Sequence, residues 1–295
     1  MSASLAGQLV FDGLAMGLIY IILAAGLVLI MSITRILFLA YGAFYTIGAY
    51  GTWYSVNYLN LPYFPSLIIG VAISAVIAVL SYILIFRQLQ KIEGGRGFLA
   101  TLIGAMGLSM VLNQGGLLIY GTTPRSIPIV FPGSLHPFGL NITTDKLVLI
   151  ILGVVITLFL FWVYEKTTLG RSMRAVAFSE EAASLQGINF STIYLFTLVF
   201  GCALAGFAGG ILAPSYGINP NMGNNILWTV MLMVMLGGMD SLPGAVLGGL
   251  VIGQIMSFGQ YYLGSMVQIA LFAFIGIVLY FRPNGLMGRG IDVGM

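Results

Sequence analysis

The sequence predicts an all-α, polytopic membrane protein. Apolar residues make up 59% of its 295 residues, only 6% are charged, and the mean hydropathy is +1.05. Several uninterrupted apolar runs reach the roughly 18 to 20 residues that a helix needs to cross a bilayer. Runs this continuous exclude a membrane barrel, whose strands alternate lipid-facing and lumen-facing residues. We therefore expect a bundle of eight to ten membrane-spanning helices.

Nine apolar stretches are expected to form these helices, in the order 8–31, 36–57, 66–87, 98–120, 146–164, 191–212, 226–239, 245–260 and 266–282. The first is too long for a signal peptide and lacks its basic start and cleavage site, so we expect it to remain in the mature protein. The stretches 226–239 and 245–260 are short for a crossing. They are expected to form either two short helices or a partly re-entrant hairpin. No internal repeat divides the chain, which predicts a single domain over residues 1–295.

Basic residues predict the orientation, because short cytoplasmic loops of membrane proteins carry an excess of Lys and Arg. Nine of the eleven basic residues can share the cytoplasmic side, namely Arg35, Arg87, Lys91, Arg96, Lys166, Arg171, Arg174, Arg282 and Arg289. Only Arg125 and Lys146 are then left outside. This places the C-terminus inside and the N-terminus outside. The net charge of +3 reflects this topology, and nucleic acid is not an expected partner.

Several function classes lack their usual residues. No titratable residue lies near the middle of a predicted span, which argues against proton coupling. A sodium site built from backbone carbonyls and hydroxyls stays open. We find no metal-ligand cluster, no nucleophile with a base and no phosphate-binding loop, so we expect neither an enzyme nor a bound cofactor or metal. The lone His136 in the outer loop is expected to be incidental. The single Cys202 lies in an apolar stretch, so it rules out disulfides and a cysteine-based metal site and is expected to be a buried small hydrophobe.

Residues 165–189 form a polar island in this apolar chain. Six of the nineteen charged residues fall within its first seventeen positions, namely Glu165, Lys166, Arg171, Arg174, Glu180 and Glu181. Alanines favour a helix over residues 171–185, and Gly187 stands where a C-terminal cap is expected. This helix is too polar to cross a membrane, so it should lie along the cytoplasmic face. It either binds a partner or simply connects two spans.

The island carries a recognisable motif. Residues 181–187, E-A-A-S-L-Q-G, resemble the E-A-A-x-x-x-G core by which permease subunits of bacterial ATP-binding-cassette (ABC) importers dock on their ATPases. T-L-G-R-S-M-R-A at 168–175 and A-A-S-L-Q-G-I-N at 182–189 resemble the coupling segment of the permeases of high-affinity branched-chain amino acid importers. L-G-G-M-D-S-L-P-G-A-V-L-G-G at 236–249 resembles their inner hairpin, and F-R-P-N-G-L at 281–286 resembles their C-terminal signature. The chain is most similar to the first of the two paralogous permeases.

This resemblance implies a permease subunit that moves branched-chain or other hydrophobic amino acids across the bacterial inner membrane. The implied partners are two P-loop ATPases that bind ATP and Mg, a second paralogous permease, a periplasmic solute-binding protein and the bilayer. In the coupling segment, about 167–190, the residues implied in ATPase coupling are Gly170, Arg171, Arg174, Glu180, Glu181, Ala182, Ala183 and Gly187. The alanines and Gly187 would supply close packing, and the charged residues would orient it.

The predicted substrate path lies on the second span. Many family members carry Asn-Phe-Ala-His-Gly where this chain has F-L-A-Y-G at 38–42, so its wall is more aromatic and we hypothesise a bulkier or more aromatic solute. One helical face collects Tyr41, Phe44, Tyr45 and Gly48, beside Gly42. This face lines the path or, as an equal alternative, packs between helices.

A turn-rich outer loop is predicted to contact the binding protein through Tyr216, Asn219, Asn221 and Asn224. Small-residue pairs at four-residue spacing predict close helix packing, namely Gly13/Gly17, Gly206/Gly210, Gly244/Gly248 and Gly249/Gly253. An ion-coupled secondary carrier, a passive channel and a non-transporting scaffold remain as rival functions. The residues alone leave open which solute is carried and whether the permease pairs with itself or with a paralogue.

Overall fold

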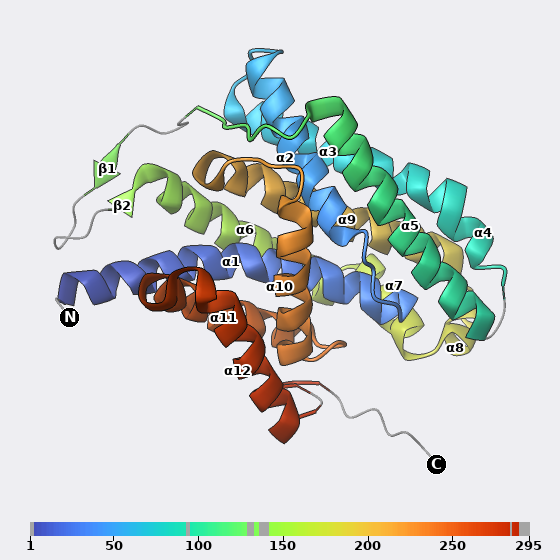
Figure 1. Ribbon diagram of the computed structural model, residues 1–295. Coiled ribbons are helices and arrows are strands. Elements are labelled where there is room, and N and C mark those ends of the chain that lie inside the picture. Colours follow the sequence, from blue (N-terminus) through green and yellow to red (C-terminus); the bar gives the residue numbers. More distant parts are fainter. Residues whose placement is uncertain (1–2, 93–94, 129–132, 136–141, 284, 289–295) are drawn as a thin grey trace. The chain divides into compact units, whose positions relative to one another are not determined.

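The computed structural model describes residues 3–92, 95–128, 133–135, 142–283 and 285–288 (Figure 1). Its helices are α1 (Ala3–Thr34), α2 (Tyr41–Asn57), α3 (Tyr63–Ser81), the π-helical η1 (Tyr82–Phe86), α4 (Arg87–Leu89), α5 (Gly95–Tyr120), α6 (Thr144–Lys166), α7 (Thr168–Phe178), α8 (Glu180–Leu185), α9 (Phe190–Tyr216), α10 (Met222–Gly237), α11 (Leu242–Leu263), the 3-10 turn η3 (Gly264–Met266) and α12 (Val267–Phe281). Two short strands, β1 (Ser134–Leu135) and β2 (Ile142–Thr143), pair antiparallel with Ser134 opposite Thr143. His136 lies outside the described residues.

Each of the nine predicted spans corresponds to a helix, which confirms the all-α polytopic fold. Six helices of the described chain are long and apolar enough to cross a membrane, namely Leu5–Thr34, Tyr63–Leu89, Arg96–Tyr120, Thr144–Lys166, Phe190–Tyr216 and Leu242–Leu263. The apolar helices α10 and α12 are shorter, and α2 has 17 residues. The number of crossings stays a prediction.

The prediction of a short span at 245–260 was wrong. Helix α11 has 22 residues and begins at Leu242. The Ser241 hydroxyl accepts a hydrogen bond from the Gly244 amide at 3.1 Å, and Pro243 occupies the first turn, where its missing amide proton costs nothing. The Pro and Gly residues that suggested a break therefore start the helix.

The chain forms two compact units. The first, the α1–α11 unit, contains Met1–Val28, Ile129–Phe159 and Thr229–Met295. The second, the α2–α9 unit, contains Leu29–Pro128 and Leu160–Trp228.

Glycines bring the helices of the α1–α11 unit together. A Cβ atom built on Gly253 of α11 would fall on the Gly17 backbone of α1, and one built on Gly249 would meet the backbone of Ile21. In the same unit, where α10 ends and α11 begins, a Cβ on Gly244 would strike the Gly237 carbonyl. The predicted close packing at these small-residue pairs is confirmed.

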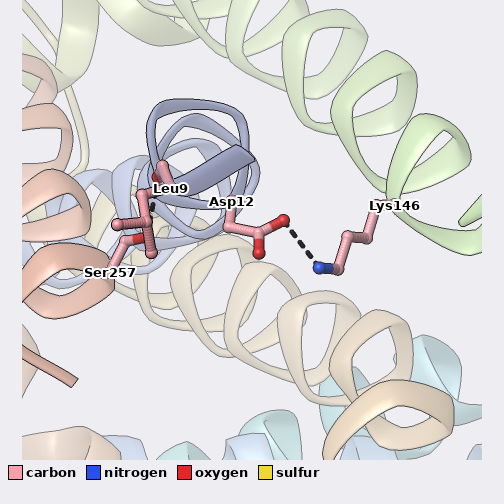
Figure 2. Close-up of polar contacts among 4 residues, drawn as sticks. All are labelled: Leu9, Asp12, Lys146 and Ser257. Atoms are coloured by element: carbon pink, nitrogen blue, oxygen red, sulfur yellow. Dashed lines mark hydrogen bonds and ion pairs between the residues drawn. The ribbon is translucent and has the colours of Figure 1, made fainter. Parts of the chain in front are cut away.

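Polar contacts also join α1 to its neighbours in this unit (Figure 2). The Ser257 hydroxyl of α11 donates to the Leu9 carbonyl oxygen at 2.7 Å, and Lys146 of α6 forms an ion pair with Asp12 at 2.6 Å. Both contacts lie near the N-terminal part of α1. They fix α6 and α11 against one stretch of a single helix.

Three helices, α2, α3 and α9, form the core of the α2–α9 unit (Figure 1). Helices α2 and α9 meet at Gly48 and Gly206, where a Cβ added to Gly48 would overlap the Gly206 backbone. The Ser74 hydroxyl of α3 donates to the Phe44 carbonyl oxygen at 3.2 Å, and the Tyr63 hydroxyl donates to the Gly210 carbonyl oxygen at 3.1 Å. Small residues therefore set the helix separation, and hydroxyls bond across it.

Candidate functional site

The coupling segment starts in a tight turn after α6. The Thr167 hydroxyl caps α7 by accepting a hydrogen bond from the Gly170 amide at 3.1 Å. The same hydroxyl donates to the Val163 carbonyl oxygen at 2.5 Å. A Cβ on Gly170 would strike the carbonyl oxygens of Val163 and Tyr164. Gly170 is therefore required for α7 to pack directly against the last turn of α6.

Arg174 ties α7 to the end of α6. Its guanidinium donates to the carbonyl oxygens of Tyr164 and, at 3.4 Å, Glu165. Its central carbon also lies 5.0 Å from the centroid of the Tyr164 ring, within cation–π range. The final carbonyls of a helix have no partner within the helix, and a basic side chain satisfies them. Arg174 thus positions the segment from inside the chain.

One face of α7 is buried within the α2–α9 unit, where α7 contacts α9. Gly170, Met173 and Val176 recur every three residues and are buried, whereas Arg171 is exposed. Arg35, in the left-handed region with φ 52°, donates to the Ala177 carbonyl oxygen at 3.4 Å. The segment is therefore an anchored, amphipathic surface helix.

The prediction of one continuous helix over 171–185 was wrong, because the helix breaks at Ser179. Its backbone is extended, with φ −154° and ψ 119°, and its hydroxyl accepts from the Ala182 amide at 3.2 Å. Serine hydroxyls compete with the helix for backbone groups in this way. The break separates α7 from α8 and gives α8 its own N-cap.

Gly187 ends α8 as predicted. Its φ is +79°, and its amide donates to the Ser184 carbonyl oxygen at 3.0 Å, while the Ile188 amide donates to that of Ala183 at 3.1 Å. This pair of bonds is a Schellman cap, which favours glycine at the left-handed position. The cap fixes the end of α8.

The last residue of α7 and the last residue of α8 expose large apolar side chains. Phe178 is 86% exposed and Leu185 is 88% exposed, although both lie in the most polar stretch of the chain. Among the predicted coupling residues, Glu180, Glu181, Ala182 and Gly187 are exposed, whereas Ala183 is 3% exposed and packs within the chain. Phe178 and Leu185 were not among the coupling residues predicted from the sequence. Two large apolar residues inside a polar island were the available signal.

The predicted substrate-path face is buried within the α2–α9 unit. Tyr41, Phe44 and Tyr45 are 1%, 0% and 6% exposed. The backbone of Gly42 meets that of Gly223, and the backbone of Gly48 meets that of Gly206. In this conformation the face is covered by neighbouring helices, so a solute can reach it only if they separate.

The predicted binding-protein contacts lie between the last residue of α9 and the first turn of α10. Tyr216 is 57% exposed, and Asn219, Asn221 and Asn224 are exposed as well. The Asn219 side-chain oxygen accepts from the Asn221 amide at 3.0 Å, which orders the turn. Helix α9 has 27 residues, so about 40 Å separates this loop from the coupling segment that precedes the helix. The two surfaces therefore occupy opposite ends of one helix.

Known proteins resemble this chain over nearly its whole length. Residues 9–282 match the family described as branched-chain amino acid transport system / permease component. The high-affinity branched-chain amino acid transport system permease protein BraD of Pseudomonas aeruginosa is 30% identical over 295 residues, covering 96% of this chain and 95% of BraD. The corresponding protein LivH of Salmonella typhimurium is 34% identical over 198 residues, covering 65% of this chain and 64% of LivH.

A solved structure shares the fold. PsaBC from Streptococcus pneumoniae in complex with Fab superposes with a TM-score of 0.50 at 15% identity, covering 92% of this chain and 91% of that one. The relatives are transporter subunits and do not favour the rival readings as a carrier or channel. The chain is a multi-pass permease subunit of the ABC importer class, and it belongs to the branched-chain amino acid transport permease family.

Proposed function

We propose that this chain moves branched-chain or other hydrophobic amino acids across the bacterial inner membrane, driven by ATP hydrolysis on separate subunits. The relatives named for branched-chain amino acid transport support the substrate class. The basic residues support a cytoplasmic C-terminus and a periplasmic N-terminus. The complex contains two P-loop ATPases that hold ATP and Mg, a second paralogous permease and a periplasmic solute-binding protein.

The exposure of Phe178 and Leu185 carries this proposal. Water-exposed aromatic and leucine side chains on a capped, anchored helix are typical of a surface that a partner covers. The neighbouring Glu180 and Glu181 and the exposed Arg171 orient the partner. In this scheme an ATPase subunit buries the two apolar side chains, and its ATP-driven movement reaches the bundle through α7 and α8.

Coupling requires that this contact differ between the two states of the transporter. A partner shifts an equilibrium only by as much as its affinities for the two states differ. The anchor at Arg174 and the backbone contact at Gly170 make α7 move together with the end of α6. At the far end of α9, Asn219, Asn221, Asn224 and Tyr216 meet the binding protein. The face of Tyr41, Phe44 and Tyr45 opens to the solute when its neighbouring helices separate.

Purification of the tagged chain from its native host in mild detergent tests the proposal. We expect a P-loop ATPase and a second permease to co-purify. Burying a Phe or Leu side chain contributes about 1.5 to 3 kcal/mol, so Phe178→Ala or Leu185→Ala should weaken ATPase binding by about tenfold or more. Neither change should unfold the chain, since both side chains are exposed.

Phe196→Ala is the matched control, because Phe196 is 48% exposed on α9 outside the coupling segment. It should retain the ATPase. A homogeneous single chain that transports leucine in liposomes without ATP would overturn the proposal. So would equal ATPase recovery from the Phe178→Ala, Leu185→Ala and control preparations.

A further inference from the structure

An aromatic cluster lies where α2 and α5 end within the α2–α9 unit. The rings of Tyr50 and Tyr120 stack with centroids 4.2 Å apart and an interplanar angle of 14°. Trp53 meets both rings edge-on, with centroids 6.5 Å from Tyr50 and 6.2 Å from Tyr120. Such aromatic pairs contribute stability in addition to that from the apolar area that they bury. The cluster is therefore an ordered aromatic wall.

Arg125 lies against this wall. Its guanidinium carbon is 5.2 Å from the centroid of Trp53. Its backbone is held by two hydrogen bonds with Ile218, Arg125 N–H to the Ile218 oxygen at 2.8 Å and the reverse bond at 2.7 Å. Ile218 lies two residues beyond the end of α9, so Arg125 lies at the end of α9 opposite the coupling segment. By the proposed orientation, this is the outer side.

Two buried polar atoms of this group have no partner. Tyr50 is only 2% exposed, and its hydroxyl forms no hydrogen bond within the described chain. The Arg125 Nε atom is likewise buried and unpaired, although the residue as a whole is half-buried. The Arg125 charge acts electrostatically on the Tyr50 hydroxyl. Buried donors without an acceptor are destabilising, and both of these donors suit the same kind of acceptor.

We propose that Arg125, Tyr50, Trp53 and Tyr120 form an entry site that binds the carboxylate of the amino acid solute. A guanidinium matches a carboxylate with two parallel hydrogen bonds, and the tyrosine hydroxyl supplies a third donor. The half-buried Tyr120 ring faces the apolar side chain of the solute. This inference rests on the proposed function. It adds that the permease itself selects for a carboxylate on the outer side.

Fluorescence of Trp53 tests the site in the complete transporter complex in lipid nanodiscs, without ATP. Trp162→Phe and Trp228→Phe leave Trp53 as the only tryptophan of this chain. The probes are L-leucine, 4-methylpentanoate, which keeps the carboxylate, and L-leucinamide, which lacks it. The first two should change Trp53 emission, and leucinamide should require an at least about tenfold higher concentration, as expected for a lost charged hydrogen-bond pair.

Substitutions at two positions, Arg125 and Tyr50, assign the roles. Arg125→Gln should weaken the leucine response by about tenfold or more. Arg125→Lys keeps the charge but loses the planar guanidinium, so its leucine response should lie between those of the wild type and Arg125→Gln. Tyr50→Phe should weaken it several-fold without lowering the thermal unfolding temperature, because the hydroxyl forms no hydrogen bond with the residues that the structure describes. Tyr54→Phe is the matched control, since Tyr54 is 45% exposed and one turn away, and it should leave the response unchanged.

Equal responses to leucine and leucinamide would overturn the proposal, as would an unchanged response in Arg125→Gln. A third contrary result is an Arg125→Gln variant that loses affinity for the unliganded solute-binding protein but keeps its leucine response. The Arg125 guanidinium would then bind a carboxylate of the solute-binding protein. Failure of the proposed function is seen separately, in the subunit composition of the purified complex.

Discussion

Gly48 of α2 and Gly206 of α9 touch backbone to backbone. A Cβ on Gly48 would overlap the Cα and carbonyl oxygen of Gly206, and one on Gly206 would meet the side chain of Ser74. The Gly48 carbonyl oxygen also accepts a hydrogen bond from the Thr52 hydroxyl at 2.8 Å. The two glycines therefore allow α2 and α9 to approach with their backbones in contact.

Gly48→Val should destabilise the α2–α9 unit. The new methyl groups have no space and must push the helices apart, which typically costs about 1 to 3 kcal/mol. Gly116→Ala on α5 is the control, because an added Cβ there meets nothing within 4 Å. It should be neutral or raise stability by up to about 1 kcal/mol. Thermal unfolding in detergent measures both, and equal losses in the two variants would contradict this packing.

The ion pair of Asp12 and Lys146 should contribute a modest, measurable coupling. Their side chains are 29% and 33% exposed, so solvent screens the interaction. Pairs of this kind contribute about 0.2 to 1 kcal/mol. Asp12→Asn, Lys146→Met and the double variant form a cycle in which the double variant loses less than the sum of the singles. Strict additivity of the three unfolding free energies would show that the pair contributes nothing.

The sequence was sufficient for the helices because crossing a bilayer requires long apolar runs. It also located Gly187 correctly, since a left-handed helix end favours glycine for local reasons. The break at Ser179 was missed because Ala-rich flanks favour a continuous helix, and one hydroxyl bond to the Ala182 amide decides against it. The start of α11 was misread because Pro and Gly signal both breaks and helix starts.

The candidate site was less predictable than the fold. Whether Ala183 turns inward and Leu185 outward depends on how α8 lies on the unit, and periodicity over six residues does not set this. Tyr50 and Arg125 are far apart in sequence, and both lie against Trp53, with the backbone of Arg125 bridged to Ile218. Contacts of this range leave no local pattern. The two polar atoms that mark the site become buried without a hydrogen-bond partner among the described residues only when the chain folds.

Arg174→Lys should loosen the coupling segment although it conserves charge. A lysine cannot bond two carbonyls and stack on Tyr164 at once, as the planar guanidinium does. We expect about 1 kcal/mol of lost stability and faster hydrogen exchange across 168–178. Arg171→Lys is the control, since Arg171 is exposed, and it should leave the exchange unchanged. Identical exchange in the two variants would refute the anchoring role.

Substitutions at Gly187 separate two explanations for its glycine. An added Cβ meets nothing within 4 Å, so within this chain the residue is glycine because of its φ of +79°. Asparagine tolerates that conformation, whereas a β-branched residue is strained there by about 1 to 2 kcal/mol. Gly187→Asn should therefore keep most of the co-purifying ATPase and of leucine uptake, and Gly187→Val should lose the α8 cap and much of both. If the ATPase instead needs a small residue at its contact surface, Asn will fail as badly as Val. ATPase recovery from the two preparations, normalised to permease, distinguishes a requirement of the backbone from a requirement of the interface.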